Sequence, residues 1–218
     1  MRRPADIDIV LPCLDEAGAL PWVLSRIPLS ARAIVVDNSS SDGSAEIARR
    51  AGAVVVTCPQ RGYGAACHAG LVAATADIVA FCDCDGSLDP VDVLRLAADL
   101  GPHVDLIIGR RRPTTRAAWP LPARLANRVL AHRVRARTGV PLTDLGPLRV
   151  ARRERLLTLD IRDRRSGYPL ETVVRAAQAG WRVEQVDVNY HPRIGQSKVT
   201  GTPRGYLQAV RDMSAVQF

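Results

Sequence analysis

The chain has 218 residues and a formal net charge of +8, from 30 Lys and Arg residues against 22 Asp and Glu residues. Hydrophobic residues make up 47% and charged residues 24%, a composition that excludes disordered, collagen-like and coiled-coil proteins. The length suits one well-buried core and is short for two independent domains. Every cationic side chain except Lys198 is an arginine, and a coding bias would not explain the position of this one lysine.

The chain has five cysteines, which form no CxxC pair and no evenly spaced framework. Neither a zinc ribbon nor a disulfide scaffold is therefore expected, and a reducing cytoplasm fits best. Asp6 and Asp8 interrupt the apolar run near the N-terminus, and the least charged stretch, 65–82, contains His68 and Asp77. We therefore expect a cytoplasmic protein without an export signal or a membrane span, whose contact with a membrane would be peripheral, at its inner face.

The first half of the chain predicts strands alternating with helices. Short apolar runs rich in β-branched residues predict buried strands at 7–11, 33–36, 54–57, 78–82 and 106–108. Helices are expected between them at 18–27, 43–51, 64–75 and 90–100. This order predicts a single-domain α/β fold, a Rossmann-like and mostly parallel sheet with helices on both faces. Ligands bind such sheets beyond the carboxyl ends of the strands.

The second half of the chain is more basic. Nine arginines lie within 110–137, and apolar residues recur there at roughly helical spacing. This pattern predicts a basic amphipathic helix over 119–137. A segment around 144–150, a helix at 169–179, an extended run at 182–190, a loop at 191–203 and a final helix are expected to follow.

Acidic residues follow the first, second and fourth predicted strands. Asp15 and Asp42 fit turn-forming or helix-capping positions as well as ligand-binding ones. Asp83 and Asp85 follow a buried strand directly and are themselves followed by Gly86. Two carboxylates at this spacing can bind one hard cation, Mg²⁺ or Mn²⁺, and leave coordination positions open for the oxygens of a diphosphate.

A loop of small residues, 61–66, opens the predicted helix at 64–75 and would let a ligand approach the backbone closely. It lacks the glycine and lysine spacing of a P-loop, and no dinucleotide-binding glycine pattern follows the first strand. The sequence therefore disfavours an NTPase or a dehydrogenase.

Together these motifs resemble family 2 glycosyltransferases of the GT-A fold, and most closely the polyprenyl-phosphate (dolichol-phosphate) mannose or glucose synthases. The motifs run in order as Leu11-Pro12-x-x-x-Glu16, Val36-Asp37-Asn38-x-x-x-Asp42-Gly43, Arg61-Gly62-x-Gly64-x-Ala66, Asp83-x-Asp85, Gly109-Arg110, Asp144-x-Gly146-x-x-Arg149, Glu171 and Arg193-x-Gly195-x-Ser197-Lys198. The chain departs from the family at Leu14-Asp15, where Tyr-Asn is common, at Asn38, where a second Asp is common, and after Asp144, where Ser-Gly-Phe is missing.

The resemblance implies a nucleotide-sugar-binding half, 1–110, and an acceptor-binding half, 111–218, within one continuous domain. It implies that the nucleotide sugar contacts Pro12, Leu14, Glu16, Val36, Asp37, Asn38, Gly64, Asp83, Cys84, Asp85, Arg110, Arg193 and Lys198. Asp83 and Asp85 would bind the metal. Asp85, Asp144, Arg193 and Lys198 would be the catalytic residues.

The activity implied is a metal-dependent, inverting transfer of a hexose from a GDP- or UDP-sugar to a polyprenyl phosphate or to a small-molecule acceptor. A phosphate acceptor arrives ionised, whereas a hydroxyl acceptor would need a general base, for which Asp144 is the candidate and Glu171 the reserve.

The helix at 119–137 would be a solvated cationic face, or it would lie on an anionic membrane and grip a lipid phosphate, with Trp119 at the interface. Nucleic acid is not expected as a partner, because the acidic strand ends would repel it. The alternative from another class is a non-catalytic basic protein that binds membranes or nucleic acid.

Overall fold

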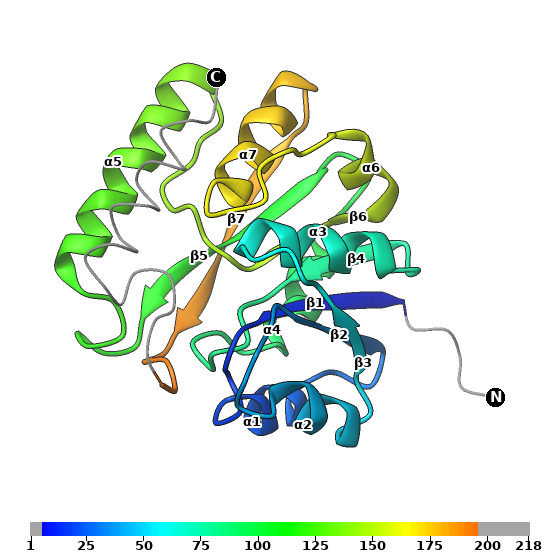
Figure 1. Cartoon of the computed structure of the whole chain (residues 1–218). Helices are drawn as coiled ribbons and strands as arrows, with labels where there is room; N and C mark the ends of the chain where they lie inside the picture. The colour runs from blue at the N-terminus through cyan, green and yellow to red at the C-terminus, as the bar shows by residue number, and fades with distance from the viewer. Residues whose placement is uncertain (1–5, 196–218) are drawn as a thin grey trace.

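The computed structural model describes residues 6–195 and contains one seven-stranded sheet in the order β3-β2-β1-β4-β6-β5-β7 (Figure 1). The strands are β1 (Ile7–Cys13), β2 (Ala31–Asp37), β3 (Val54–Thr57), β4 (Ile78–Phe81), β5 (Leu106–Pro113), β6 (Arg149–Arg152) and β7 (Val183–Tyr190). β6 runs antiparallel to its neighbours β4 and β5, and the other pairs are parallel. The predicted α/β fold with a mostly parallel sheet is confirmed.

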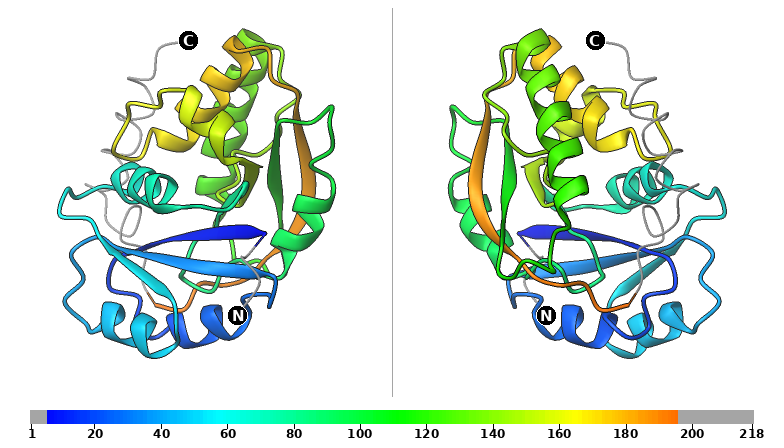
Figure 2. Two further views of the ribbon diagram at one scale, coloured as in Figure 1. Left: turned by 90° about the vertical axis from the view of Figure 1, so that its right-hand side faces the viewer. Right: turned by 90° about the vertical axis from the view of Figure 1, so that its left-hand side faces the viewer.

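Helices cover both faces of the sheet (Figure 2). One face is covered by α1 (Leu20–Ser25), α2 (Ser44–Arg50) and α4 (Asp92–Ala98). The other is covered by α3 (Tyr63–Ala73), α5 (Leu121–Thr138), α6 (Arg153–Thr158) and α7 (Tyr168–Gln178).

β1 lies inside the sheet and packs against the apolar layers on both of its faces. Successive side chains point to opposite faces, so Val10 packs in the α3 layer while Ile9 and Leu11 pack in the α1 layer. α3 lies directly on this strand because Gly70 has no side chain. A Cβ at Gly70 would lie 2.3 Å from a methyl carbon of Val10.

Two features differ from the predicted elements. β5 continues beyond 106–108 as far as Pro113, because its arginine-rich end pairs with β7 in register from Leu106 to Pro113. α6 was not predicted.

Within residues 6–195, no helix has both the length and the apolar character needed to cross a membrane. Ser197, Lys198 and the final predicted helix lie outside the described residues.

Candidate functional site

The loops that follow β1, β2 and β4 meet at one edge of the sheet. The backbone N–H of Asn38 donates to the carbonyl of Cys13 at 2.8 Å, and the N–H of Cys82 donates to the carbonyl of Val10 at 3.0 Å. The three strands are neighbours and parallel, so their acidic carboxyl ends come together as predicted.

Asp83 is half-buried in this edge. The Tyr63 hydroxyl donates a hydrogen bond to Oδ1 of Asp83 at 3.2 Å. Burial, together with the charge of Asp85, raises the pKa of the Asp83 carboxyl to about 6. A carboxylate whose ionisation is opposed by burial and by a neighbouring carboxylate suits a bound cation, and carboxylate oxygens are the ligands that Mg²⁺ and Mn²⁺ prefer.

Asp85 is 5% exposed and joins the β4 loop to the segment that follows β7. Its Oδ1 accepts the N–H of Ser87 at 2.9 Å, and its Oδ2 lies 2.9 Å from a guanidinium nitrogen of Arg193. Its carbonyl accepts the N–H of Ile194 at 2.8 Å, and the carbonyl of Ser87 accepts the N–H of His191 at 2.9 Å. Arg193 therefore meets the predicted metal-binding loop, although the two lie far apart in the sequence.

Two residues predicted to contact the nucleotide act inside the protein instead. Val36 is fully buried in the core, so its side chain cannot reach a ligand. The Asn38 amide donates to the carbonyls of Cys58 and Gln60, at 2.9 and 2.7 Å, and accepts the N–H of Gly62 at 2.8 Å. These bonds occupy the side chain in holding the loop that enters α3.

The other predicted nucleotide contacts lie at the edge itself. Pro12, Leu14 and Glu16 are half-buried. Asp37 is 9% exposed. Cys84 is 2% exposed, so only its backbone suits a ligand, as predicted.

Asp15 and Asp42 hold the first two loops to each other. Oδ1 of Asp15 accepts the N–H of Ser41 at 2.7 Å, and Oδ2 of Asp42 accepts the N–H of Ala17 at 2.8 Å. Asp42 also accepts the N–H of Ser44 at the start of α2, at 3.0 Å. Their turn-forming and capping interpretation is the one that the geometry supports.

Gly64 faces protein rather than a ligand, which differs from the prediction. Its N–H donates to the carbonyl of Arg165 at 3.0 Å, and the N–H of Ala65 donates to the carbonyl of Arg164 at 2.8 Å. A Cβ at Gly64 would lie 2.8 Å from the carbonyl oxygen of Asp163. The small residues of this loop therefore admit a second loop, 160–166.

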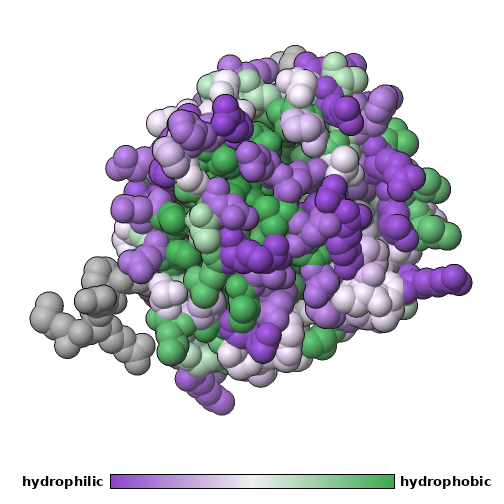
Figure 3. Space-filling view, turned by 180° about the vertical axis from the view of Figure 1, so that it is seen from behind, coloured by the Kyte–Doolittle hydropathy of each residue, from purple (hydrophilic) through white to green (hydrophobic). Residues whose placement is uncertain are grey.

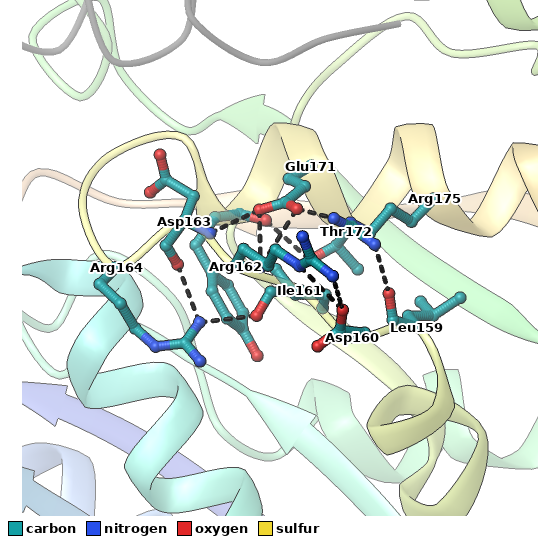
Figure 4. Close-up of polar contacts among 10 residues, drawn as sticks. Leu159, Asp160, Ile161, Arg162, Asp163, Arg164, Glu171, Thr172 and Arg175 are labelled. Atoms are coloured by element: carbon teal, nitrogen blue, oxygen red, sulfur yellow. Dashed lines mark hydrogen bonds and ion pairs between the residues drawn. The ribbon is translucent and has the colours of Figure 1, made fainter.

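Glu171 organises that loop (Figure 4). Its carboxylate accepts the N–H of Arg162 at 3.0 Å and that of Asp163 at 2.6 Å, and it forms an ion pair with Arg175 at 2.5 Å. At 9% exposure, Glu171 is committed to these contacts. The geometry therefore gives the reserve general base a structural role.

Asp144 forms a buried ion pair with Arg111. The Arg111 guanidinium donates to both carboxylate oxygens, at 2.6 and 3.0 Å, and the Arg111 backbone N–H donates to Oδ2 at 2.7 Å. The Trp119 ring stacks on the guanidinium, whose carbon lies 3.8 Å from the ring centroid. Asp144 is 3% exposed, so the geometry makes it the residue that fixes Arg111 rather than a free base.

A cavity of about 410 Å³ opens beside this pair, between the end of β5 and α5. It is lined by several arginines, among them Arg111, Arg112, Arg124, Arg128 and Arg135. No Asp or Glu occurs anywhere in 106–143, although this stretch contains nine arginines. We refer to this cavity as the arginine groove.

Arg110 was predicted to contact the diphosphate or the acceptor phosphate. It leaves β5 on the face opposite to Arg111, and it also lines the arginine groove. Both Arg110 and Arg112 form ion pairs with Asp187 on the neighbouring strand β7. These charges are therefore already neutralised in part.

The arginine groove and the Asp83–Asp85 edge are connected through aromatic residues. Tyr190 packs edge-to-face on Trp119 with ring centroids 5.9 Å apart, and the Arg111 guanidinium carbon lies 5.3 Å from the Tyr190 centroid. Tyr190 also lies close enough to Arg193, the partner of Asp85, to help raise the pKa of that guanidinium against the effect of burial. A chain of side-chain contacts thus links the paired carboxylates to the arginines of the groove.

Sequence reasoning missed Tyr63 and Arg111 as members of this site, and it assigned a lipid phosphate to the basic helix 119–137 without singling out Arg124 or Arg128. Tyr63 stands inside a motif that was interpreted through its glycines alone. For the arginines the available signal was the absence of acids from 106–143.

The sequence matches the family model described as Glycosyl transferase family 2 over residues 8–156. Among curated relatives, an uncharacterized glycosyltransferase of Mycobacterium bovis is 53% identical over 207 residues, which cover 94% of this chain and 95% of that protein. A dolichyl-phosphate hexose transferase of Haloferax volcanii is 28% identical over 199 residues, covering 89% and 86% of the two chains.

Solved structures with the same fold include glucosyl-3-phosphoglycerate synthase from Mycobacterium tuberculosis. Its complex with Mn²⁺, uridine diphosphate and glucosyl-3-phosphoglycerate superposes with a TM-score of 0.76 at 26% identity, covering 96% of this chain and 77% of that one. The complex of the same enzyme with Mg²⁺ and uridine diphosphate gives a TM-score of 0.77 at 25% identity, covering 96% and 77%.

Proposed function

The chain belongs to glycosyltransferase family 2, and on that premise we propose that it transfers a hexose from a GDP- or UDP-sugar to the phosphate of a polyprenyl phosphate. In this transfer an acceptor oxygen bonds to the anomeric carbon as the bond from that carbon to the diphosphate breaks, and the electron pair leaves with the nucleoside diphosphate.

Asp83 and Asp85 are the residues proposed to hold Mg²⁺ or Mn²⁺. Within residues 6–195 no third His, Cys, Asp or Glu joins them to complete a cluster, so most coordination positions would remain for diphosphate oxygens and water. When bound, the cation would neutralise charge on the diphosphate leaving group. The structures of the mycobacterial synthase with Mn²⁺ or Mg²⁺ and uridine diphosphate support the use of such a cation with this fold.

The observation that favours a phosphate over a hydroxyl as the acceptor group is the ion pair between Asp144 and Arg111. Because both oxygens of Asp144 accept hydrogen bonds from Arg111, this carboxylate is poorly placed to take a proton from an acceptor hydroxyl. A phosphate, by contrast, arrives already ionised and needs cations that position it. Arg111, Arg124 and Arg128 line a groove that offers them.

An apolar stripe on α5 supports a lipid carrier for that phosphate. Leu121, Leu125 and Val129 recur every fourth residue and are 69%, 58% and 58% exposed. Hydrophobic residues stand out among hydrophilic ones on the side of the molecule where α5 lies (Figure 3). An apolar stripe beside arginines suits a peripheral contact with an anionic membrane, through these residues rather than through Trp119, which packs against Arg111.

A soluble phosphorylated acceptor is the second candidate. It is favoured by the structure of the mycobacterial synthase with glucosyl-3-phosphoglycerate, a phosphate-bearing product. The arginine groove suits either source of phosphate, so the two acceptors have to be compared directly.

The first experiment is a thermal-shift screen of GDP- and UDP-sugars with Mn²⁺. One donor class is expected to raise the melting temperature of the wild-type protein but not that of Asp85→Ala. A non-catalytic basic protein would respond to no donor and would release no nucleotide. An equal shift in Asp85→Ala would remove Asp85 from the metal site.

A further inference from the structure

We propose that Tyr63 is a positioning residue for the cation site, whose hydroxyl holds the Asp83 carboxylate in the orientation that binds a divalent cation. This inference rests on the proposed function, because it takes Asp83 and Asp85 as the metal ligands.

The contact joins two separate elements. Tyr63 is the first residue of α3, Asp83 lies in the loop after β4, and the hydroxyl of Tyr63 lies 3.2 Å from Oδ1 of Asp83. Asp83 has no other hydrogen-bond donor from residues 6–195 at that oxygen. The orientation of Asp83 therefore depends on where α3 begins.

The start of α3 is fixed from the opposite side. The N–H groups of Gly64 and Ala65 donate to the carbonyls of Arg165 and Arg164, at 3.0 and 2.8 Å, and Glu171 holds the backbone of the loop 160–166. A Cβ at Gly62 would lie 2.1 Å from the carbonyl oxygen of Arg164, so this approach requires a glycine. The tyrosine next to it is thereby held in one place.

The Tyr63 ring is also confined. It packs beside Cys67, Arg149 and Tyr168, with which it lines a cavity of only about 10 Å³, room for about one water molecule. The hydroxyl is therefore presented to Asp83 from a partly buried, closely packed ring.

A neutral donor suits this carboxylate for a reason of charge. Arg193 neutralises Asp85 directly, at 2.9 Å. A phenol is protonated at neutral pH, so Tyr63 orients Asp83 without cancelling its negative charge. One hydroxyl takes one of the several acceptor positions of a carboxylate and leaves the others for a cation.

Tyr168 offers a matched control. It lines the same cavity and packs edge-to-face on Phe81, with centroids 6.0 Å apart, but its hydroxyl is buried and has no hydrogen-bond partner among the described residues. Tyr63→Phe and Tyr168→Phe therefore remove the same atom from the same region, and only the first removes a contact to Asp83.

The experiment titrates Mn²⁺ into the full-length protein without nucleotide and measures free Mn²⁺ by electron paramagnetic resonance, for wild type, Tyr63→Phe, Tyr168→Phe and Asp83→Asn. Tyr63→Phe is expected to raise the Kd for Mn²⁺ about tenfold, the effect of losing one hydrogen bond to a charged group. Tyr168→Phe should leave the Kd unchanged. Circular dichroism checks that each variant is folded at the temperature of the titration, so that reduced stability does not obscure the comparison.

The outcomes separate this inference from the proposed function. If wild type and Asp83→Asn bind Mn²⁺ equally, the assignment of the metal site is wrong. If Asp83→Asn loses binding but Tyr63→Phe matches wild type, the metal site stands and the positioning role of Tyr63 is wrong. An equal loss in both tyrosine variants would also overturn it, because it would point to packing rather than to the hydrogen bond.

Discussion

The guanidinium of Arg193 lies 2.9 Å from the carboxylate of Asp85, so the segment that leaves β7 closes on the loop that leaves β4. Two backbone hydrogen bonds, from Ile194 to Asp85 and from His191 to Ser87, hold the same two segments together. The guanidinium of Arg193 is thereby kept next to the position proposed for the leaving diphosphate.

Arg193→Gln is expected to lower the rate of transfer about 100-fold, because it removes a charged donor from the position where negative charge develops. Arg116→Gln is the control, since Arg116 is exposed and does not line the arginine groove. Steady-state kinetics with saturating donor measures both. Full activity in Arg193→Gln would show that its contact with Asp85 is only structural.

Removal of positive charge from the arginine groove should weaken the binding of the acceptor and leave the binding of the donor unchanged. Arg124→Gln combined with Arg128→Gln is expected to raise the KM for a phosphate acceptor at least tenfold, while the affinity for the donor stays unchanged. Arg133→Gln, on the same helix but outside the groove, provides the control. A rise in donor KM instead would place the nucleotide in this groove.

The Asp144–Arg111 pair predicts a large effect on stability. Asp144→Asn leaves a guanidinium that is only 13% exposed without its counter-charge, so we expect a loss of about 3–5 kcal/mol in the free energy of unfolding. Replacing both partners, as Asp144→Leu with Arg111→Met, should restore most of it. Urea unfolding measures each variant, and a single-variant loss below about 1 kcal/mol would contradict a buried pair.

Asp8 predicts how stability depends on pH. Burial alone would raise the pKa of this carboxyl, but hydrogen bonds from Arg32, Ala76 and Thr75 outweigh it and hold the pKa below its ordinary value. A lower pKa in the folded than in the unfolded chain means that ionised Asp8 stabilises the fold above the unfolded value of about 3.9. The stabilisation is lost as the pH falls through the folded value.

Urea unfolding of wild type and Asp8→Asn from pH 7 to pH 3 tests this. The advantage of wild type should be constant down to about pH 5 and should shrink below it. An advantage that persisted undiminished at pH 3 would mean that the charge of Asp8 plays no part.

The strand ends could be predicted because buried parallel strands leave a strong local pattern. The apolar runs that became β1, β2 and β4 end directly before their acidic loops, so the meeting of Asp83 and Asp85 with the first two loops followed from topology alone. The basic helix was predicted as 119–137 and lies at Leu121–Thr138, since its apolar spacing is also local.

The partners of the charged residues could not be predicted in the same way, because they depend on contacts distant in the sequence. Gly64 meets the loop 160–166, and nothing near position 64 indicates this. Successive side chains of β5 point to opposite faces, which separates Arg110 from Arg111, but the predicted strand ended at 108. A strand continued to Pro113 would have placed them on opposite faces.

The most direct test of the account is transfer of a radiolabelled hexose from the donor found by thermal shift, with Mn²⁺, to polyprenyl phosphate in anionic vesicles and, separately, to 3-phosphoglycerate. We predict label in the extractable lipid, dependent on Asp85 and on the Arg124 and Arg128 pair. Label in phosphoglycerate alone would keep the phosphate site and replace the lipid acceptor. Transfer to neither, or transfer to a neutral hydroxyl that Arg124→Gln with Arg128→Gln leaves unchanged, would contradict the proposal that the groove binds an acceptor phosphate.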